Sequence, residues 1–127
     1  MILSITLPIR VISETNQREH WAKKHRRKKG QRAAVNAILS RFGELGEAVP
    51  LPVVVTCTRI APRPLDGHDN LTEAFKAVVD EIAYLYHRDD ADPCFVWRYA
   101  QEKGRPKTYE VRIEIERDCT EPEDANA

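Results

Sequence analysis

The chain has few cysteines and no motif typical of a zinc protein. Its cysteines are three in number, Cys57, Cys94 and Cys119. They are too scattered for a zinc ribbon and odd in number for a closed set of disulfides, so we expect reduced thiols. The four histidines show neither an HExxH pattern nor another paired spacing, which argues against zinc. His68 is either a minor metal ligand or a loop residue.

Long hydrophobic runs are also missing. No stretch approaches the roughly 20 apolar residues that a membrane-spanning helix needs. The start of the chain, MILSITLPIR, lacks the charged and apolar regions of a secretory signal. We therefore expect a cytoplasmic protein with no membrane partner. A chain of 127 residues without internal repeats is a common size for one domain.

The sequence has no excess of either charge, yet its charges are segregated along the chain. Lysine plus arginine and aspartate plus glutamate number 20 each. Residues 16–32 contain eight basic residues and one acidic residue, whereas residues 110–127 contain seven acidic and two basic residues. Such segregation is typical of a protein with a basic surface for a polyanion and an acidic tail.

Hydrophobic periodicity and turn residues predict an α+β domain. The expected order is strand, helix, strand, helix, strand, strand, which gives a mixed four-stranded sheet with two helices packed on one face. The first strand should lie near an edge of the sheet, because Pro8 falls near its end. We expect the domain to span residues 1–117 and the acidic tail, residues 118–127, to be disordered. The predicted strands cover residues 2–11, 51–60, 94–102 and 107–116, the last two joined by a turn at 103–106.

The first predicted helix has two different halves. Ser13, Thr15 and Asn16 offer N-cap oxygens, and glycines follow Phe42. Projected as a helix, its apolar stripe consists of Val35, Leu39 and Phe42, and Trp21 extends this stripe toward the N-terminus. The N-terminal half is basic nearly all round, which favours a helix that projects past the core toward a polyanion over one that lies on the core. A merely solvated charged face is the open alternative.

The second predicted helix, residues 70–86, has an apolar face opposite a polar stripe. Asp69, Glu73, Lys76 and Asp80 follow one another at helical spacing on that stripe, and Asp66 lies just before the helix. Clustered carboxylates repel one another unless a cation neutralises them. With Asp89 or Asp90 arriving at the start of the next strand, the set is typical of a Mg²⁺ site completed by a phosphate. Lys76 would then stabilise charge on that phosphate.

Simpler interpretations of the same residues remain open. Asp69 can serve only as a helix cap, since an anion is favoured beside the free N–H groups of a first turn. Asp89 and Asp90 can be turn residues, and Lys76 can pair with Glu73 or Asp80 across one helical turn. Spacing alone does not choose between these interpretations and a metal site.

Three ordered motifs resemble the RusA-like Holliday junction resolvases of bacteria and their phages. They are the run from Asp66 through Asn70, Leu71 and Lys76 to Asp80, the segment DDADP at 89–93, and WRYAQ at 97–101. The segment SETNQREHW at 13–21 also resembles the one that these proteins carry after their first strand. The resemblance covers residues 5–116.

This resemblance implies a Mg²⁺-dependent endonuclease, with Mn²⁺ as a substitute, that acts as a homodimer and cuts four-way DNA junctions by paired nicks. It places the metal ligands at Asp66, Asp69 and Asp90, with Asp89 beside them, and the catalytic lysine at Lys76. In the best-known members the lysine stands where this chain has Glu73, one helical turn before Lys76. It also implies a bacterial, prophage or phage origin.

The leading hypothesis is therefore a structure-selective DNA endonuclease whose basic helix contacts phosphates without reading sequence. The expected DNA-binding residues are Asn16, Arg18, Lys23, Lys24, Arg26, Arg27, Lys28, Lys29 and Arg32. One alternative is a non-catalytic protein that binds junction or duplex DNA. Another is an interaction domain whose basic helix docks an acidic protein.

Overall fold

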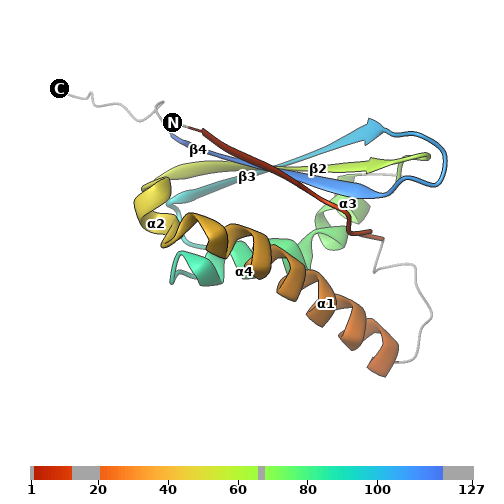
Figure 1. Ribbon diagram of the computed structural model, residues 1–127, viewed down its shortest axis with the longest axis horizontal. Coiled ribbons are helices and arrows are strands. Elements are labelled where there is room, and N and C mark those ends of the chain that lie inside the picture. Colours follow the sequence, from red (N-terminus) through yellow and green to blue (C-terminus); the bar gives the residue numbers. More distant parts are fainter. Residues whose placement is uncertain (1, 13–20, 66–67, 119–127) are drawn as a thin grey trace.

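The computed structural model describes residues 2–12, 21–65 and 68–118, without the side chains of His68 and Asp69. Helices cover one face of a single sheet (Figure 1). The predicted α+β class, with a four-stranded mixed sheet in one small domain, is confirmed. In chain order the elements are β1 Ile2–Leu7, α1 Trp21–Leu39, η1 Ser40–Phe42, α2 Leu45–Ala48, β2 Val53–Ala61, α3 His68–Ala74, α4 Lys76–Leu85, β3 Phe95–Lys103 and β4 Glu110–Arg117.

The sheet has the strand order β1-β4-β2-β3, so β1 lies at an edge as predicted. The strand β4 is antiparallel to both of its neighbours, whereas β2 and β3 are parallel. β1 is shorter than its predicted range because it ends at Leu7, directly before Pro8, which cannot donate to a ladder. None of the helices in these described ranges is both long and apolar enough to cross a membrane.

Alternate residues of the strands form the face that packs on the helices. One row across the sheet is Leu3, Ile115, Val55 and Trp97, and the next is Ile5, Ile113, Cys57 and Tyr99. These side chains belong to the core or pack against it. In the following row two polar residues, Arg59 and Gln101, stand beside Leu7 and Val111. At this end of the sheet the apolar face therefore gives way to a polar pair, Arg59 and Gln101.

The last two strands are not neighbours, which corrects the predicted turn between them. β2 lies between β3 and β4, so residues 104–109 pass the end of β2. The Gly104 N–H donates to the Ala61 carbonyl over 2.9 Å. A Cβ at Gly104 would lie only 2.9 Å from Cγ2 of Ile60, so the close approach requires glycine.

Helix α1 packs through its C-terminal half only. Gln31, Val35 and Leu39 are its buried residues, whereas none of residues 21–30 is buried, so the basic half extends past the core as predicted (Figure 1). Two members of the predicted apolar stripe are exposed instead. Trp21 is 73% exposed because that part of α1 has no sheet beside it. Phe42 is 47% exposed because it follows a change to a 3₁₀ turn, whose tighter winding rotates side chains off the α-helical stripe.

The second predicted helix is two helices. The chain leaves helical geometry at Phe75, with φ −92° and ψ 4°, and α4 begins at Lys76. The Phe75 N–H lies between the carbonyls of Leu71 and Thr72, at 3.3 and 3.2 Å. The Phe75 side chain is fully buried and stacks on Tyr99 with ring centroids 5.8 Å apart. Packing of this ring in the core accompanies a break that no Pro or Gly marks in the sequence.

A buried acid joins α1 to α4. Glu81 is 6% exposed, and its carboxylate accepts hydrogen bonds from Arg32 Nε at 2.8 Å and from Asn36 Nδ2 at 3.0 Å. Both donors are on α1 and Glu81 is on α4. A buried carboxylate with both oxygens satisfied gives the two helices a defined register. The basic half of α1 is thereby held beside the start of α4.

Candidate functional site

The loop before β3 orients three neighbouring acids in different ways. Asp89 Oδ1 accepts a hydrogen bond from the Ala91 N–H at 2.9 Å, and Asp92 Oδ1 accepts one from the Cys94 N–H at 2.8 Å. These two aspartates therefore shape the turn. Asp90 instead directs its carboxylate toward α4. The Trp97 Nε1–H donates to the Asp90 carbonyl at 2.9 Å, which ties this residue to β3.

Lys76 lies between two carboxylates at the first residue of α4. Its ammonium is 3.0 Å from Asp90 Oδ2 and 3.0 Å from Asp80 Oδ1, one helical turn further along. The hydrogen bond from Lys76 lowers the pKa of Asp90, and the bonds to Asp90 and then Asp80 raise the pKa of Lys76. All three side chains are between one third and one half exposed. The site is thus an open charged cluster accessible from solvent.

A second loop, residues 62–65, is held by the polar pair at the end of the sheet's core face. Gln101 Oε1 accepts from the Leu65 N–H at 2.7 Å, and Gln101 Nε2 donates to the Leu65 carbonyl at 3.1 Å. Arg59 Nη1 donates to the Arg63 carbonyl at 2.7 Å, and its Nε donates to the Val11 carbonyl at 3.2 Å. The backbone directly before Asp66 is therefore fixed to β2 and β3.

Tyr99 connects the charged cluster to the core. It stands two residues from both Trp97 and Gln101 on β3, so all three share the helix-facing side of that strand. Burial raises the pKa of the Tyr99 phenol to about 12, and the charges of Lys76 and Asp90 also act on it. Its hydroxyl consequently stays protonated at neutral pH. One face of this edge strand thus anchors both loops, the one at 62–65 through Gln101 and the one before β3 through Trp97.

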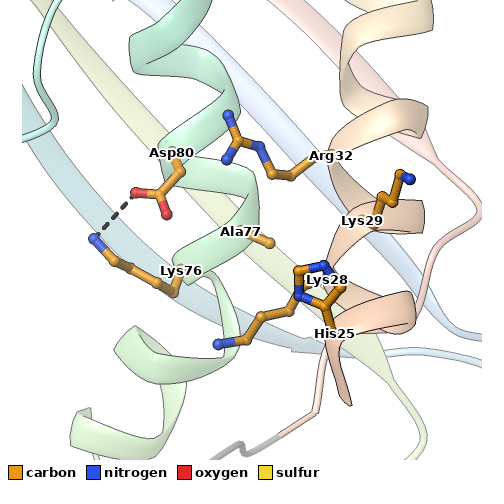
Figure 2. A pocket seen from close by; sticks show the side chains of 7 residues that line it. All are labelled: His25, Lys28, Lys29, Arg32, Lys76, Ala77 and Asp80. Atoms are coloured by element: carbon orange, nitrogen blue, oxygen red, sulfur yellow. Dashed lines mark ion pairs between the residues drawn. The ribbon is translucent and has the colours of Figure 1, made fainter. Parts of the chain in front are cut away.

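A basic cleft of about 400 Å³ opens between α1 and α4 beside this cluster. Figure 2 shows that Lys28 extends from α1 toward α4. Lys76 and Asp80 of α4 also line the cleft, and in this view their side chains extend to the side of α4 away from α1. Arg32 is paired with Glu81, and Lys76 with Asp80 and Asp90. Lys28 and Lys29 line the cleft without an ion pair to another described residue. The cleft therefore has an excess of positive charge suited to an anion.

The structure brings together part of the predicted site. Lys76 and Asp90, which are distant in sequence, are in contact, and Asp89 is the residue beside them. Asp66 lies outside the described residues, and Asp69 lies in α3 with its side chain outside the description. Within the described ranges no three His, Cys, Asp or Glu side chains are grouped to hold a metal ion. Among the polar-stripe side chains that the structure describes, Lys76 and Asp80 are joined, whereas Glu73 lies on α3, a helix separate from α4.

Some of the expected DNA-binding residues lie outside the described residues, and the others lie on α1. Asn16 and Arg18 lie outside the described residues. The others are all on α1, and Arg32 also serves as the partner of Glu81. Those on the half of α1 beyond the core are Lys23, Lys24, Arg26, Arg27, Lys28 and Lys29.

Comparison with models of known protein families and with curated proteins finds no match for this chain. The functional argument therefore depends on the site itself. Sequence reasoning missed the parts played by Arg59 and Tyr99. The sequence indicated Gln101 only as the last residue of the WRYAQ motif. The alternation of Trp97, Tyr99 and Gln101 along a strand could have indicated that these three residues share one face.

Proposed function

We propose that this protein is a structure-selective DNA endonuclease that cuts four-way junctions by Mg²⁺-dependent phosphodiester hydrolysis. The observation that carries the proposal is the contact between Lys76 and Asp90, 3.0 Å apart, beside a basic cleft. A fixed cation and a carboxylate at the end of an anion-binding groove are the parts that phosphoryl chemistry needs. The resemblance to RusA-like resolvases supports the choice of a branched DNA substrate.

The donor set fits a hard divalent cation. The bond from Lys76 lowers the pKa of Asp90 and so favours its ionised form, and the side chain is 35% exposed. Carboxylate oxygens are the ligands that Mg²⁺ prefers, usually with waters and substrate phosphate. Asp90 would hold the ion together with Asp66 and Asp69, and with Asp89 beside them. When bound, Mg²⁺ polarises a phosphate and activates a coordinated water.

The protein's own residues would divide the remaining work. Lys76 neutralises charge that develops on the scissile phosphate. Lys28 and Lys29 position the neighbouring phosphates in the cleft through contacts that do not read sequence. Gln101 and Trp97 fix the two loops that carry the acids. A homodimer would present two such sites to a junction of similar two-fold symmetry and so produce paired nicks.

The decisive experiment is nicking of a labelled four-way junction and of a matched linear duplex by the parent and by Asp90→Asn. We expect symmetric Mg²⁺-dependent cuts in the junction that fall by on the order of 100-fold or more in the variant, because a ligand is lost. Junction binding should persist in Asp90→Asn. Asp92→Asn is the matched control, since that acid holds its own loop. Equal cutting by the parent and Asp90→Asn would overturn the assignment.

A non-catalytic junction- or duplex-binding protein is the second candidate. Lys76 is paired with both Asp80 and Asp90, an arrangement in which the acids need only the lysine as their counter-charge. This candidate predicts tight, salt-sensitive binding and no Mg²⁺-dependent product from the parent protein. Such a result with every divalent metal would replace the endonuclease proposal.

A further inference from the structure

We propose that Trp21 and His25 form a stacking platform for an unpaired nucleobase at the outer end of α1. The proposal deepens the DNA-binding part of the proposed function and rests on it. The platform concerns neither the metal ligands nor Lys76. It is a separate surface that would favour DNA with exposed bases, such as the centre of a branched molecule, over continuous duplex.

The geometry of the two rings is the first observation. Trp21 and His25 are one helical turn apart, their centroids are 5.2 Å apart and their planes differ by 11°. The indole is 73% exposed. The imidazole supports one side of the indole, which leaves most of its surface open to solvent. A large aromatic ring held in place but not buried is uncommon on a folded domain, where such rings normally enter the core.

The charge around these rings is the second observation. Trp21 and His25 line a shallow hollow of about 250 Å³ together with Lys24 and Lys28. Helix α1, from Trp21 to Leu39, contains no acidic residue. Aromatic rings among lysines match single-stranded nucleic acid, because the cations attract the backbone and the ring stacks on a base. A protein partner would need a strongly acidic surface with an apolar tip to fit the same place.

The hollow continues toward the proposed cutting site. His25 and Lys28 line both this hollow and the larger cleft that contains Lys76. At about 1.5 Å of rise per residue, Trp21 lies roughly 16 Å along the helix axis from Arg32. One strand can therefore run along α1, with phosphates near Lys28 and a base on Trp21. The base on Trp21 would lie several nucleotides from the cut. In a continuous duplex that base would be paired and could not stack on the indole.

The test compares binding of a labelled oligothymidylate and of a matched blunt duplex to the parent, Trp21→Ala and Trp21→Phe, in EDTA so that nothing is cut. Loss of one stacked base is worth about 1–3 kcal/mol. We therefore expect Trp21→Ala to bind the single strand roughly 5- to 150-fold more weakly, with a much smaller loss on duplex. Trp21→Phe should retain most of the affinity, since a phenyl ring still stacks.

Lys24→Ala is the control for charge. It should weaken binding to both DNAs and make the salt dependence shallower by about one unit of slope, whereas Trp21→Ala should leave that slope unchanged. Oligothymidylate should also quench tryptophan emission in the parent but not in Trp21→Phe, whose only tryptophan is Trp97. Folding is not in question for these variants, because Trp21 is exposed; unchanged circular dichroism checks this.

Unchanged single-strand affinity in Trp21→Ala, or an equal loss on both DNAs, would overturn the platform. Its failure can be separated from failure of the endonuclease proposal. If the parent nicks junctions and Trp21→Ala binds single strands as the parent does, the platform alone is wrong. If no nicking occurs but single-strand binding depends on Trp21, the platform stands and the endonuclease proposal fails.

Discussion

At the scale of single residues, chemistry depends on what each polar side chain is bonded to. Asp89, Asp90 and Asp92 are alike in sequence, but two of them hold their own turn and one faces Lys76. Lys76 pairs with Asp80 across one helical turn, one of the two partners left open from the sequence, and it also contacts Asp90 across the fold. The residue type alone could not assign these partners.

Gln101 provides a test of loop positioning. Gln101→Leu keeps a side chain of similar size but removes both hydrogen bonds to the Leu65 backbone. We expect junction nicking to fall and the Mg²⁺ concentration for half-maximal rate to rise about ten-fold, since outer partners of this kind cost 10- to 100-fold in metal affinity. The free energy of unfolding should fall by only about 1 kcal/mol. An unchanged Mg²⁺ requirement in Gln101→Leu would contradict a positioning role for Gln101. Gln101→Glu keeps an acceptor for the Leu65 N–H and should recover part of the nicking rate.

The pair formed by Lys76 and Asp90 makes a prediction about pH. The pKa of Asp90 lies below its usual range mainly because of the bond from Lys76. The pair therefore stabilises the fold above the ordinary carboxyl pKa, and this contribution is lost as the pH falls through the depressed folded value. Urea unfolding of the parent and Lys76→Met should differ by less than about 1 kcal/mol at neutral pH, because the pair is partly exposed. The difference in free energy of unfolding should vanish at acidic pH, where Asp90 is protonated. A difference that stays constant with pH would show that the ion pair is not its source.

At the scale of elements, two departures from the predicted helices decide where the site lies. Phe75 interrupts the expected helix so that its ring enters the core, and the interruption leaves Lys76 at the start of α4 opposite Asp90. Periodicity could not reveal this, because Leu71, Phe75, Val78 and Val79 fit one continuous apolar stripe equally well. The break coincides with the stacking of Phe75 on Tyr99, a contact between residues distant in the chain.

The attachment of α1 to α4 can be tested through Glu81. Glu81→Ala removes the buried acceptor of Arg32 and Asn36 and should lower the free energy of unfolding by about 2–3 kcal/mol in a urea titration. DNA affinity should also fall, because α1 would no longer hold its lysines beside Lys76. Glu73→Ala, at an exposed acid of α3, is the matched control and should change stability by less than about 0.5 kcal/mol. Equal stability of the two variants would mean that Glu81 does not fix the helix register.

At the scale of the whole molecule, the basic segment of the sequence is set apart in space from the sheet. The basic half of α1 projects beyond the sheet, whereas the acidic residues of β4 lie within it (Figure 1). This arrangement reconciles a formal net charge of zero with a locally basic surface. The cleft between α1 and α4 joins that surface to the charged cluster.

Paired cutting makes a prediction about assembly. If the protein resolves junctions as proposed, light scattering should give a mass of two chains at the concentrations used for cutting. Dilution that yields a single-chain mass should also convert paired nicks into separate single nicks, because the two sites would no longer act on one junction. Paired cuts by a species that remains one chain would exclude the homodimer.

The sequence by itself determined the class of fold, the edge position of β1 and the projecting basic half of α1. Each of these follows from local information, namely strand and helix periodicity, a proline near a strand end, and a run of lysines and arginines without acids. The tertiary structure decided which residues meet: the parallel pairing of β2 with β3, the contact of Lys76 with Asp90, and the hold of Gln101 and Arg59 on the loop at 62–65. These contacts join residues that are distant in the chain. They depend on the strand order and on the packing of Phe75, and both of these depend on how the whole core is packed.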